Sequence, residues 1–211
     1  MNRLRSAPLT CALIGVNLAF FLSEEIFRHL FDSSLFPALA LSREGIVGGA
    51  WWQLFSHAFL HGNLLHLMVN MAALWFTGPA LEEILGSVRY LVLYFGGIVA
   101  GGMLQTFSSP ASIDLVGASG AVCALLVGFA TLFPRLEITA LIFFLIPVRM
   151  KAATLGWLVV LGSIVFWLFG IEKEVGHMAH LGGAIAGFLI CTYFKRRGVL
   201  SDLLIASPPI R

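Results

Sequence analysis

Charged residues are scarce in this sequence. Only 11% of its 211 residues are Asp, Glu, Lys or Arg, whereas 59% are hydrophobic. Soluble domains typically contain about 25% charged residues, so this composition excludes an ordinary soluble domain and predicts an integral membrane protein. The net charge is +2 and no basic stretch carries interleaved aromatic residues, so we expect no nucleic-acid partner.

Cysteine is scarce as well. Cys11, Cys123 and Cys191 fall within apolar segments and form no CxxC or CxxxC pattern. We therefore expect neither disulfides nor a cysteine-ligated metal, and we interpret all three as small core residues.

Apolar runs, in contrast, fill most of the chain. Six segments come near the length needed to cross the hydrocarbon core of a bilayer: 7–27, 62–81, 89–107, 117–133, 150–169 and 177–195. They predict an all-α membrane protein in which residues 1–211 form a single membrane domain. The first segment lacks a small-residue cleavage site and runs into Glu24 and Glu25, so we interpret it as a retained span rather than a signal peptide.

The basic residues predict the orientation of these spans. With six spans, ten Lys and Arg residues share the side of the N-terminus, namely Arg3, Arg5, Arg89, Arg135, Arg149, Lys151, Lys195, Arg196, Arg197 and Arg211. Three lie on the opposite side, namely Arg28, Arg43 and Lys173. By the positive-inside rule, both termini are expected to be cytoplasmic.

Two connections need separate interpretation. Residues 136–148 are strongly apolar but too short for a comfortable span, and we interpret them as an interfacial stretch on the inner side. A seventh span there would place Ser119 and His180 on opposite faces of the membrane. The outer loop 28–61 contains Trp51 and Trp52, which favours a position in the membrane interface, although a simple anchoring role is the alternative.

Polar residues gather at one depth in this topology. The second, fourth and sixth spans all run inward, and their N-terminal ends carry His61, His66 and Asn70; Ser119; and His177 and His180. Polar side chains at membrane depth are costly and mark functional sites, and the positive ends of three helix dipoles point to the same place. The spacing therefore predicts a site just below the outer surface.

Ser119 and His180 are the residue pair that can form a nucleophile and its base. A serine at a helix start is often a cap or a small packing residue, and that alternative stays open here. However, Gly117 and Gly120 flank Ser119 and allow a neighbouring helix to approach closely. A serine hydroxyl becomes a good nucleophile only when a base such as imidazole takes its proton.

The surroundings of His180 favour a dyad over a triad. Small residues at 179, 183 and 187 form a helix-packing stripe beside it. Three acidic residues come near in the sequence, Asp114, Glu172 and Glu174, but none falls on a helix beside His180. We therefore predict a Ser–His dyad, and we expect His177 to be hydrogen-bonded to a loop carbonyl.

His66 and Asn70 lie four residues apart and share a helix face. Both can donate hydrogen bonds, so together with the Ser119 N–H they could form an oxyanion hole; interhelical hydrogen bonding is the alternative. His57 and His61 have the same spacing, which suits metal ligands. On a continuous helix they would point away from His66, and no cysteine or carboxylate completes a set. We interpret both as forming structural hydrogen bonds and expect no metal.

Taken together, these residues resemble a known family. Gly117-Ala118-Ser119-Gly120 resembles the GxSG motif of the rhomboid intramembrane serine proteases, and Ala179-His180-x-x-Gly183-x-x-x-Gly187 resembles their sixth-helix motif. His66-x-x-x-Asn70 is similar to the family's second-helix motif, and Glu82-x-x-x-Gly86-Ser87 to the turn that follows it. The set, in this order, extends from about residue 50 to about residue 190.

The resemblance implies a six-helix rhomboid-like bundle that cleaves transmembrane segments of other membrane proteins. Ser119 would be the nucleophile, His180 the base, and His66, Asn70 and the Ser119 N–H the oxyanion donors, with no metal or organic cofactor. It implies a bacterial inner membrane location with the site toward the outer face.

Two departures from the family are visible, and two rival functions remain open. Trp52-Gln53 stands where Trp-Arg is frequent, and Cys123 stands where one bacterial subgroup has tyrosine. The rivals are a noncatalytic rhomboid-like protein that binds membrane clients and a small transporter. Internal repeats would favour the transporter, and the sequence contains none.

Overall fold

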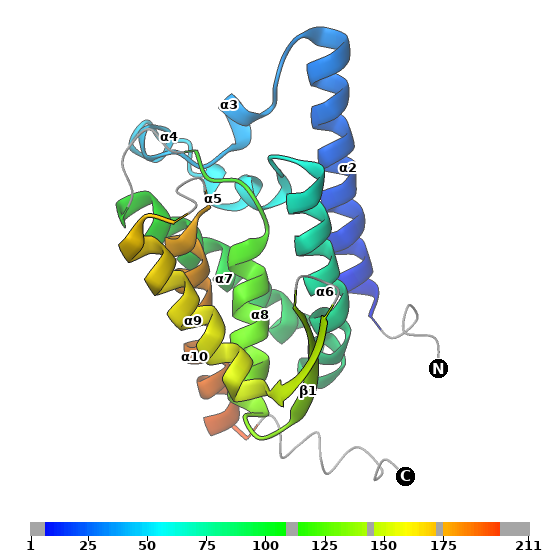
Figure 1. Ribbon diagram of the computed structural model, residues 1–211. Coiled ribbons are helices and arrows are strands. Elements are labelled where there is room, and N and C mark those ends of the chain that lie inside the picture. The colour runs from blue at the N-terminus through cyan, green and yellow to red at the C-terminus, as the bar shows by residue number, and fades with distance from the viewer. Residues whose placement is uncertain (1–6, 109–113, 143–145, 172–174, 199–211) are drawn as a thin grey trace.

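The structure is a computed structural model that describes residues 7–108, 114–142, 146–171 and 175–198. In these ranges, six helices of 14 or more residues run roughly alongside one another (Figure 1). They are α2 (Pro8–Phe31), α6 (Leu64–Leu85), α7 (Ser87–Ser108), α8 (Ser119–Leu132), α9 (Ala152–Phe169) and α10 (His177–Arg196). Each coincides with one of the six predicted segments.

Five of these helices, all except α8, are long and apolar enough to cross a membrane. With 14 residues, α8 is about 21 Å long, which is less than the roughly 30 Å of a hydrocarbon core. The structure therefore supports five full-length spans and one shorter apolar helix, rather than six equal spans. α8 contacts α6, α7, α9 and α10, so most of its surface faces protein and not lipid.

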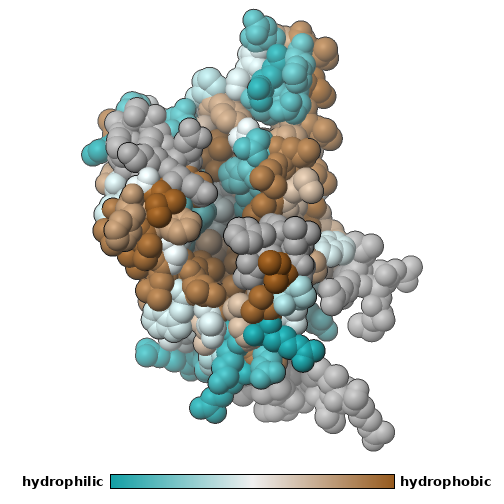
Figure 2. Space-filling model, viewed as in Figure 1, coloured by the Kyte–Doolittle hydropathy of each residue, from teal (hydrophilic) through white to brown (hydrophobic). Residues whose placement is uncertain are grey.

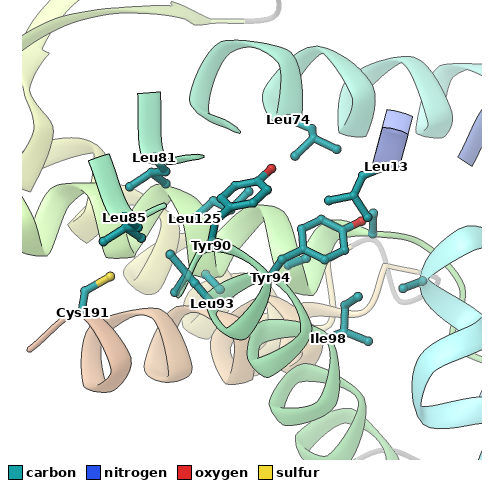
Figure 3. Close-up of a cluster of buried hydrophobic side chains, with 14 of the residues drawn as sticks. Leu13, Leu74, Leu81, Leu85, Tyr90, Leu93, Tyr94, Ile98, Leu125 and Cys191 are labelled. Atoms are coloured by element: carbon teal, nitrogen blue, oxygen red, sulfur yellow. The ribbon is translucent and has the colours of Figure 1, made fainter. Parts of the chain in front are cut away.

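The main core lies between α6, α7 and α8. Figure 3 shows the rings of Tyr90 and Tyr94 projecting from α7 toward Leu74 of α6, with Leu13 of α2 beside Tyr94. All four side chains are buried. This apolar cluster fixes α6 against α8, and thereby fixes the N-terminal end of α6 relative to that of α8.

Small residues bring α7, α8 and α10 into backbone contact. A Cβ added at Gly183 of α10 would overlap the carbonyl oxygen of Gly120 in α8, and one added at Gly187 would overlap that of Ala124. A Cβ at Gly101 of α7 would lie 2.6 Å from the carbonyl oxygen of Ala179. The predicted small-residue stripe of α10 is thus confirmed as a packing face.

The outer loop is partly helical, and its first residues are hydrogen-bonded to α2. α2 continues to Phe31, one helical turn beyond the predicted end of the first span. The loop then forms α3 (Phe36–Leu39), α4 (Arg43–Val47), α5 (Gln53–Ser56) and the 3-10 turn η1 (His57–Phe59). The buried Glu24 carboxylate accepts hydrogen bonds from the Ser34 hydroxyl and the Leu35 N–H, both at 2.7 Å.

The expectation of an all-α protein is wrong in one segment. Within residues 136–148, predicted as an interfacial stretch, the chain forms β1 (Glu137–Ile142), which pairs antiparallel with β2 (Ile146–Lys151). β-Branched residues such as Ile138, Thr139 and Val148 favour strands, and the segment is too short to span as a helix. The hairpin joins the end of α8 to the start of α9 (Figure 1).

Glu82 connects the far ends of α2 and α6. One of its carboxylate oxygens accepts the Leu9 N–H at 2.9 Å, and the other accepts the N–H and hydroxyl of Thr10, both at 2.8 Å. These N–H groups belong to the first turn of α2, where they have no partner within the helix. The carboxylate also complements the positive end of that helix. Four residues later, Gly86 adopts φ +73° and begins the turn into α7.

We predict that Glu82→Gln lowers the stability of the fold. Hydrogen bonds to a charged group contribute about 1.5–3 kcal/mol, and the amide keeps only one acceptor oxygen. The thermal unfolding midpoint in detergent should fall clearly below that of the wild type. Glu83→Gln is the matched control, because Glu83 is exposed. Equal midpoints for the two variants would show that Glu82 has no anchoring role.

Candidate active site

Ser119 is the first residue of α8, and its side chain is free of a capping role. Ala118 occupies the N-cap position, and no side chain caps this helix. The alternative interpretation of Ser119 as an N-cap is therefore wrong. The Ser119 N–H points out of the first turn, where helix N–H groups lack internal partners, and it has no hydrogen-bond partner in the described part of the chain.

The turn before Ser119 needs the glycine at 117. Gly117 has φ +114°, and a Cβ there would lie 2.7 Å from both Cε1 and Nε2 of His66. The backbone of this turn thus touches the His66 ring directly, which only glycine allows. The Gly117 N–H donates to the His57 carbonyl oxygen at 2.9 Å, which ties the turn to the outer loop.

A second link holds the same turn. Leu41 of the outer loop and Leu115 exchange backbone hydrogen bonds of 3.0 and 2.8 Å, and both side chains are buried. The outer loop therefore has a structural role, because it sets the path of the chain into Ser119.

His180 lies in the first turn of α10, at the same end of the α8–α10 contact as Ser119. Gly183, one turn further along α10, packs on Gly120, the residue after Ser119. The backbone of Ala179 is fixed as well, because its N–H donates to Gln105 Oε1 of α7 at 3.1 Å. Both Ser119 and His180 are half-buried, so each can still be reached.

The helix ends that carry Ser119 and His180 pack on each other at Gly120 and Gly183, but among the described residues the two side chains make no hydrogen bond with each other. In enzymes without substrate, such hydrogen bonds are often long and tighten only in the complex. No described carboxylate contacts His180: Asp114 is exposed, and Glu172 and Glu174 lie outside the described residues. Within the part of the chain that the structure describes, the serine and the imidazole have no carboxylate as a third member.

His66 and Asn70 come from the first turns of α6 and face this region. Asn63 caps the helix by accepting the His66 N–H at 2.8 Å. The buried Asn70 amide donates to the His66 carbonyl oxygen at 2.9 Å. Since an amide nitrogen carries two N–H groups, one remains for a ligand. The turn at Gly117 before α8 lies against the His66 ring, and Gly120 of α8 packs on Gly183 of α10, so the N-terminal ends of α6, α8 and α10 lie near one another.

His57 and His61 differ from each other in environment. His57 Nδ1 lies 2.7 Å from the Gln53 carbonyl oxygen, which confirms the structural hydrogen bond predicted for it. His61 is buried, yet neither of its ring nitrogens has a hydrogen-bond partner in the described residues. Burial lowers the pKa of each to about 4, so both are neutral at pH 7.

The prediction that His61 points away from His66 is wrong. Their ring centroids lie 5.0 Å apart in an edge-on arrangement. The prediction assumed one continuous helix, whereas η1 ends at Phe59 and α6 begins at Leu64, so the chain turns between them. Among the described residues, no group of three or more His, Cys, Asp or Glu side chains could hold a metal ion.

The remaining predicted residues are placed as follows. His177 Nε2 lies 2.8 Å from the Ile171 carbonyl oxygen, which confirms the expected hydrogen bond to a loop carbonyl. Cys123 is buried within α8. Gln53, which stands in place of arginine, is also buried and accepts the Ser42 N–H at 3.3 Å, so glutamine serves the loop fold.

Sequence reasoning missed Gln105 as a supporting residue. Its side-chain oxygen holds the residue before His180. The available signal was a single amide within the otherwise apolar segment 89–107, since a polar side chain in a span usually has a partner on another helix.

Comparison with known proteins identifies the family of this chain. The rhomboid domain matches residues 48–197. The chain is 30% identical over 161 residues to the rhomboid protein YdcA of Bacillus subtilis (strain 168), covering 72% of this chain and 73% of that one. It is also 30% identical over 194 residues to the rhomboid protease GlpG of Pectobacterium atrosepticum, covering 90% of this chain and 65% of that one.

A third relative is mitochondrial. Rhomboid protein 1 of Saccharomyces cerevisiae is 30% identical over 200 residues, covering 89% of this chain and 54% of that one. The chain thus spans less than two thirds of the length of both this relative and GlpG. The match to the rhomboid domain includes every residue of the candidate site, and the apolar helices are those of a membrane bundle. The chain is an integral membrane protein that belongs to the rhomboid family.

Proposed function

We propose that this protein is a serine endopeptidase that cleaves transmembrane segments of other membrane proteins by a Ser119–His180 dyad. The observation that carries the proposal is the meeting of the N-terminal ends of α6, α8 and α10. Close packing of α8 on α10 supports the pairing of Ser119 with His180. The contact between Gly117 and the His66 ring brings the third helix to the same place.

The proposed reaction follows from these roles. The Ser119 oxygen attacks the scissile carbonyl carbon while its proton passes to an imidazole nitrogen of His180. The imidazolium then gives the proton to the departing amine nitrogen. A water molecule, deprotonated by His180, attacks the acyl-enzyme and releases the second product. No described carboxylate contacts His180, so in this proposal the packing of α10 on α7 and α8 orients the imidazole.

Charge that develops on the carbonyl oxygen needs donors. The Ser119 N–H lies at the positive end of α8, and it lacks a hydrogen-bond partner in the described residues. His66 and the second N–H of Asn70 are the further donors in this proposal. Donors already fixed in place stabilise the transition state without reorganisation.

The chemistry also limits the substrate. An α-helix hides its carbonyl groups in hydrogen bonds, so the scissile segment must unwind. We therefore expect substrate segments that contain Gly, Pro or polar residues, with a small residue just before the cut. We place the protein in a bacterial inner membrane with both termini cytoplasmic and the site near the outer face, as the basic residues indicate.

A second function, noncatalytic binding of membrane clients, is favoured by one observation. The Ser119 and His180 side chains make no hydrogen bond with each other in the described residues. A serine-reactive fluorophosphonate discriminates between the two functions, because it labels a serine only when a base activates it.

We predict that the wild-type protein is labelled by a fluorophosphonate and cleaves a model transmembrane substrate in detergent. Ser119→Ala and His180→Ala should each lose both properties while keeping the unfolding midpoint near that of the wild type. Ser163→Ala is the matched control, since the Ser163 hydroxyl only donates to Val159 within α9. Unlabelled wild-type protein would favour client binding, and a labelled His180→Ala variant would exclude His180 as the base.

The role of Asn70 is tested by separating rate from stability. If Asn70 donates to the oxyanion, Asn70→Ala should lower kcat by about 10²–10³ with little change in KM. Thr77→Val is the matched control, because the Thr77 hydroxyl also donates to the carbonyl four residues earlier in α6. It should leave kcat unchanged. A normal kcat per folded molecule of Asn70→Ala would assign Asn70 to helix packing alone.

A further inference from the structure

A groove opens between α8, α9 and α10 at the end of the bundle opposite the candidate active site. Its volume is about 600 Å³, within the range of about 300–1,000 Å³ that is typical of ligand sites. Its walls are formed by the second half of α8, the first half of α9 and the second half of α10. α8 begins at Ser119 and α10 begins at His177. The candidate active site lies at these N-terminal ends, whereas the groove lies toward the C-terminal ends, so the two are separate.

The groove faces the surroundings of the bundle and not its core. Trp157 of α9 and Ile185 and Phe188 of α10 line it with exposed fractions of 64%, 46% and 52%. Figure 2 shows that apolar surface over α9 gives way to hydrophilic surface at the lower end of the molecule. The groove therefore runs from apolar residues such as Trp157 toward Lys195 at its polar end. A phospholipid has the same order, with an apolar chain followed by a polar headgroup.

The floor of the groove is made by small residues. A Cβ added at Gly156 of α9 would lie 2.9 Å from the Cβ of Ala130 in α8, so these helices are in contact there. Ala153 and Ala184 also line the groove. Short side chains on three neighbouring helices leave a channel between the larger residues at the rim, and a flexible hydrocarbon chain can fill such a channel.

A basic side chain lies at the polar end of the groove. Lys195 lines it and is exposed. Within the described residues the Lys195 side chain makes neither an ion pair nor a hydrogen bond, and no acidic residue lines the groove. Arg196 and Arg197 follow directly and are exposed, but neither lines the groove. An apolar groove that ends at an ammonium group with no partner in the described residues complements a molecule with an acyl chain and a negative head.

We propose that this groove binds one anionic phospholipid, with an acyl chain between α9 and α10 and the phosphate on Lys195. Basic side chains at the end of a transmembrane helix attract anionic lipid headgroups, and the long lysine stem lets the ammonium group reach the headgroup level. A zwitterionic lipid supplies the same chains but carries its own ammonium group beside the phosphate. The preference for the anionic headgroup therefore depends on Lys195.

The test measures the lipid that the purified full-length chain retains. The protein is placed in nanodiscs that contain equal amounts of phosphatidylglycerol and phosphatidylcholine, transferred to detergent, and examined by native mass spectrometry. We expect about five-fold more retained phosphatidylglycerol than phosphatidylcholine, the ratio that one basic side chain near an anionic surface supplies. Equal retention of the two lipids would overturn the proposal, because the groove would then bind acyl chains without recognising the headgroup.

Two matched pairs of variants locate the site. Lys195→Gln should abolish the preference, whereas Arg196→Gln removes the same charge from the next residue and should keep it. Thr192→Trp fills the groove and should reduce the retention of both lipids; Leu189→Trp, on an exposed face of α10 outside the groove, should not. Equal losses within either pair would overturn the proposal. Unfolding midpoints for each variant identify any loss that is due to unfolding.

Discussion

The candidate site depends on the backbone contact between α8 and α10. No side chain separates these helices where Gly183 meets the Gly120 carbonyl and Gly187 meets that of Ala124. In a membrane, helices associate through such close packing rather than through the hydrophobic effect. Because the contact lies within one turn of both Ser119 and His180, it fixes the distance between the proposed nucleophile and its proposed base.

The remaining elements position α6, which carries His66 and Asn70, relative to α8. The apolar cluster around Tyr90 and Tyr94 fixes α6 relative to α8, and the Gly117 turn rests on the His66 ring. The outer loop holds that turn through the His57 carbonyl. Loop, turn and helices thus form one connected support, which suits a site whose donors must already be in place before charge develops.

Much of this arrangement could be predicted from the sequence. Hydropathy predicts where the long helices lie, and the basic residues predict the direction in which each one crosses the membrane. The prediction that Ser119, His180, His66 and Asn70 lie near one another followed from that orientation alone. The hairpin did not, since a short apolar run reads equally as strand or helix. The packing of His61 on His66 depends on where α6 begins, and helix boundaries are the least reliable part of such predictions.

The central claim is that close approach at Gly183 sets the geometry of the Ser119–His180 pair, and the rate of fluorophosphonate labelling of Gly183→Ala tests it most directly. A Cβ at 183 would overlap the Gly120 carbonyl, whereas a Cβ at Gly162 of α9 would meet nothing within 4 Å. Misplacement by about 1 Å can lower a rate by about 10². We predict such a loss for folded Gly183→Ala and a wild-type rate for Gly162→Ala. Folded Gly183→Ala that is labelled at the wild-type rate would contradict the account.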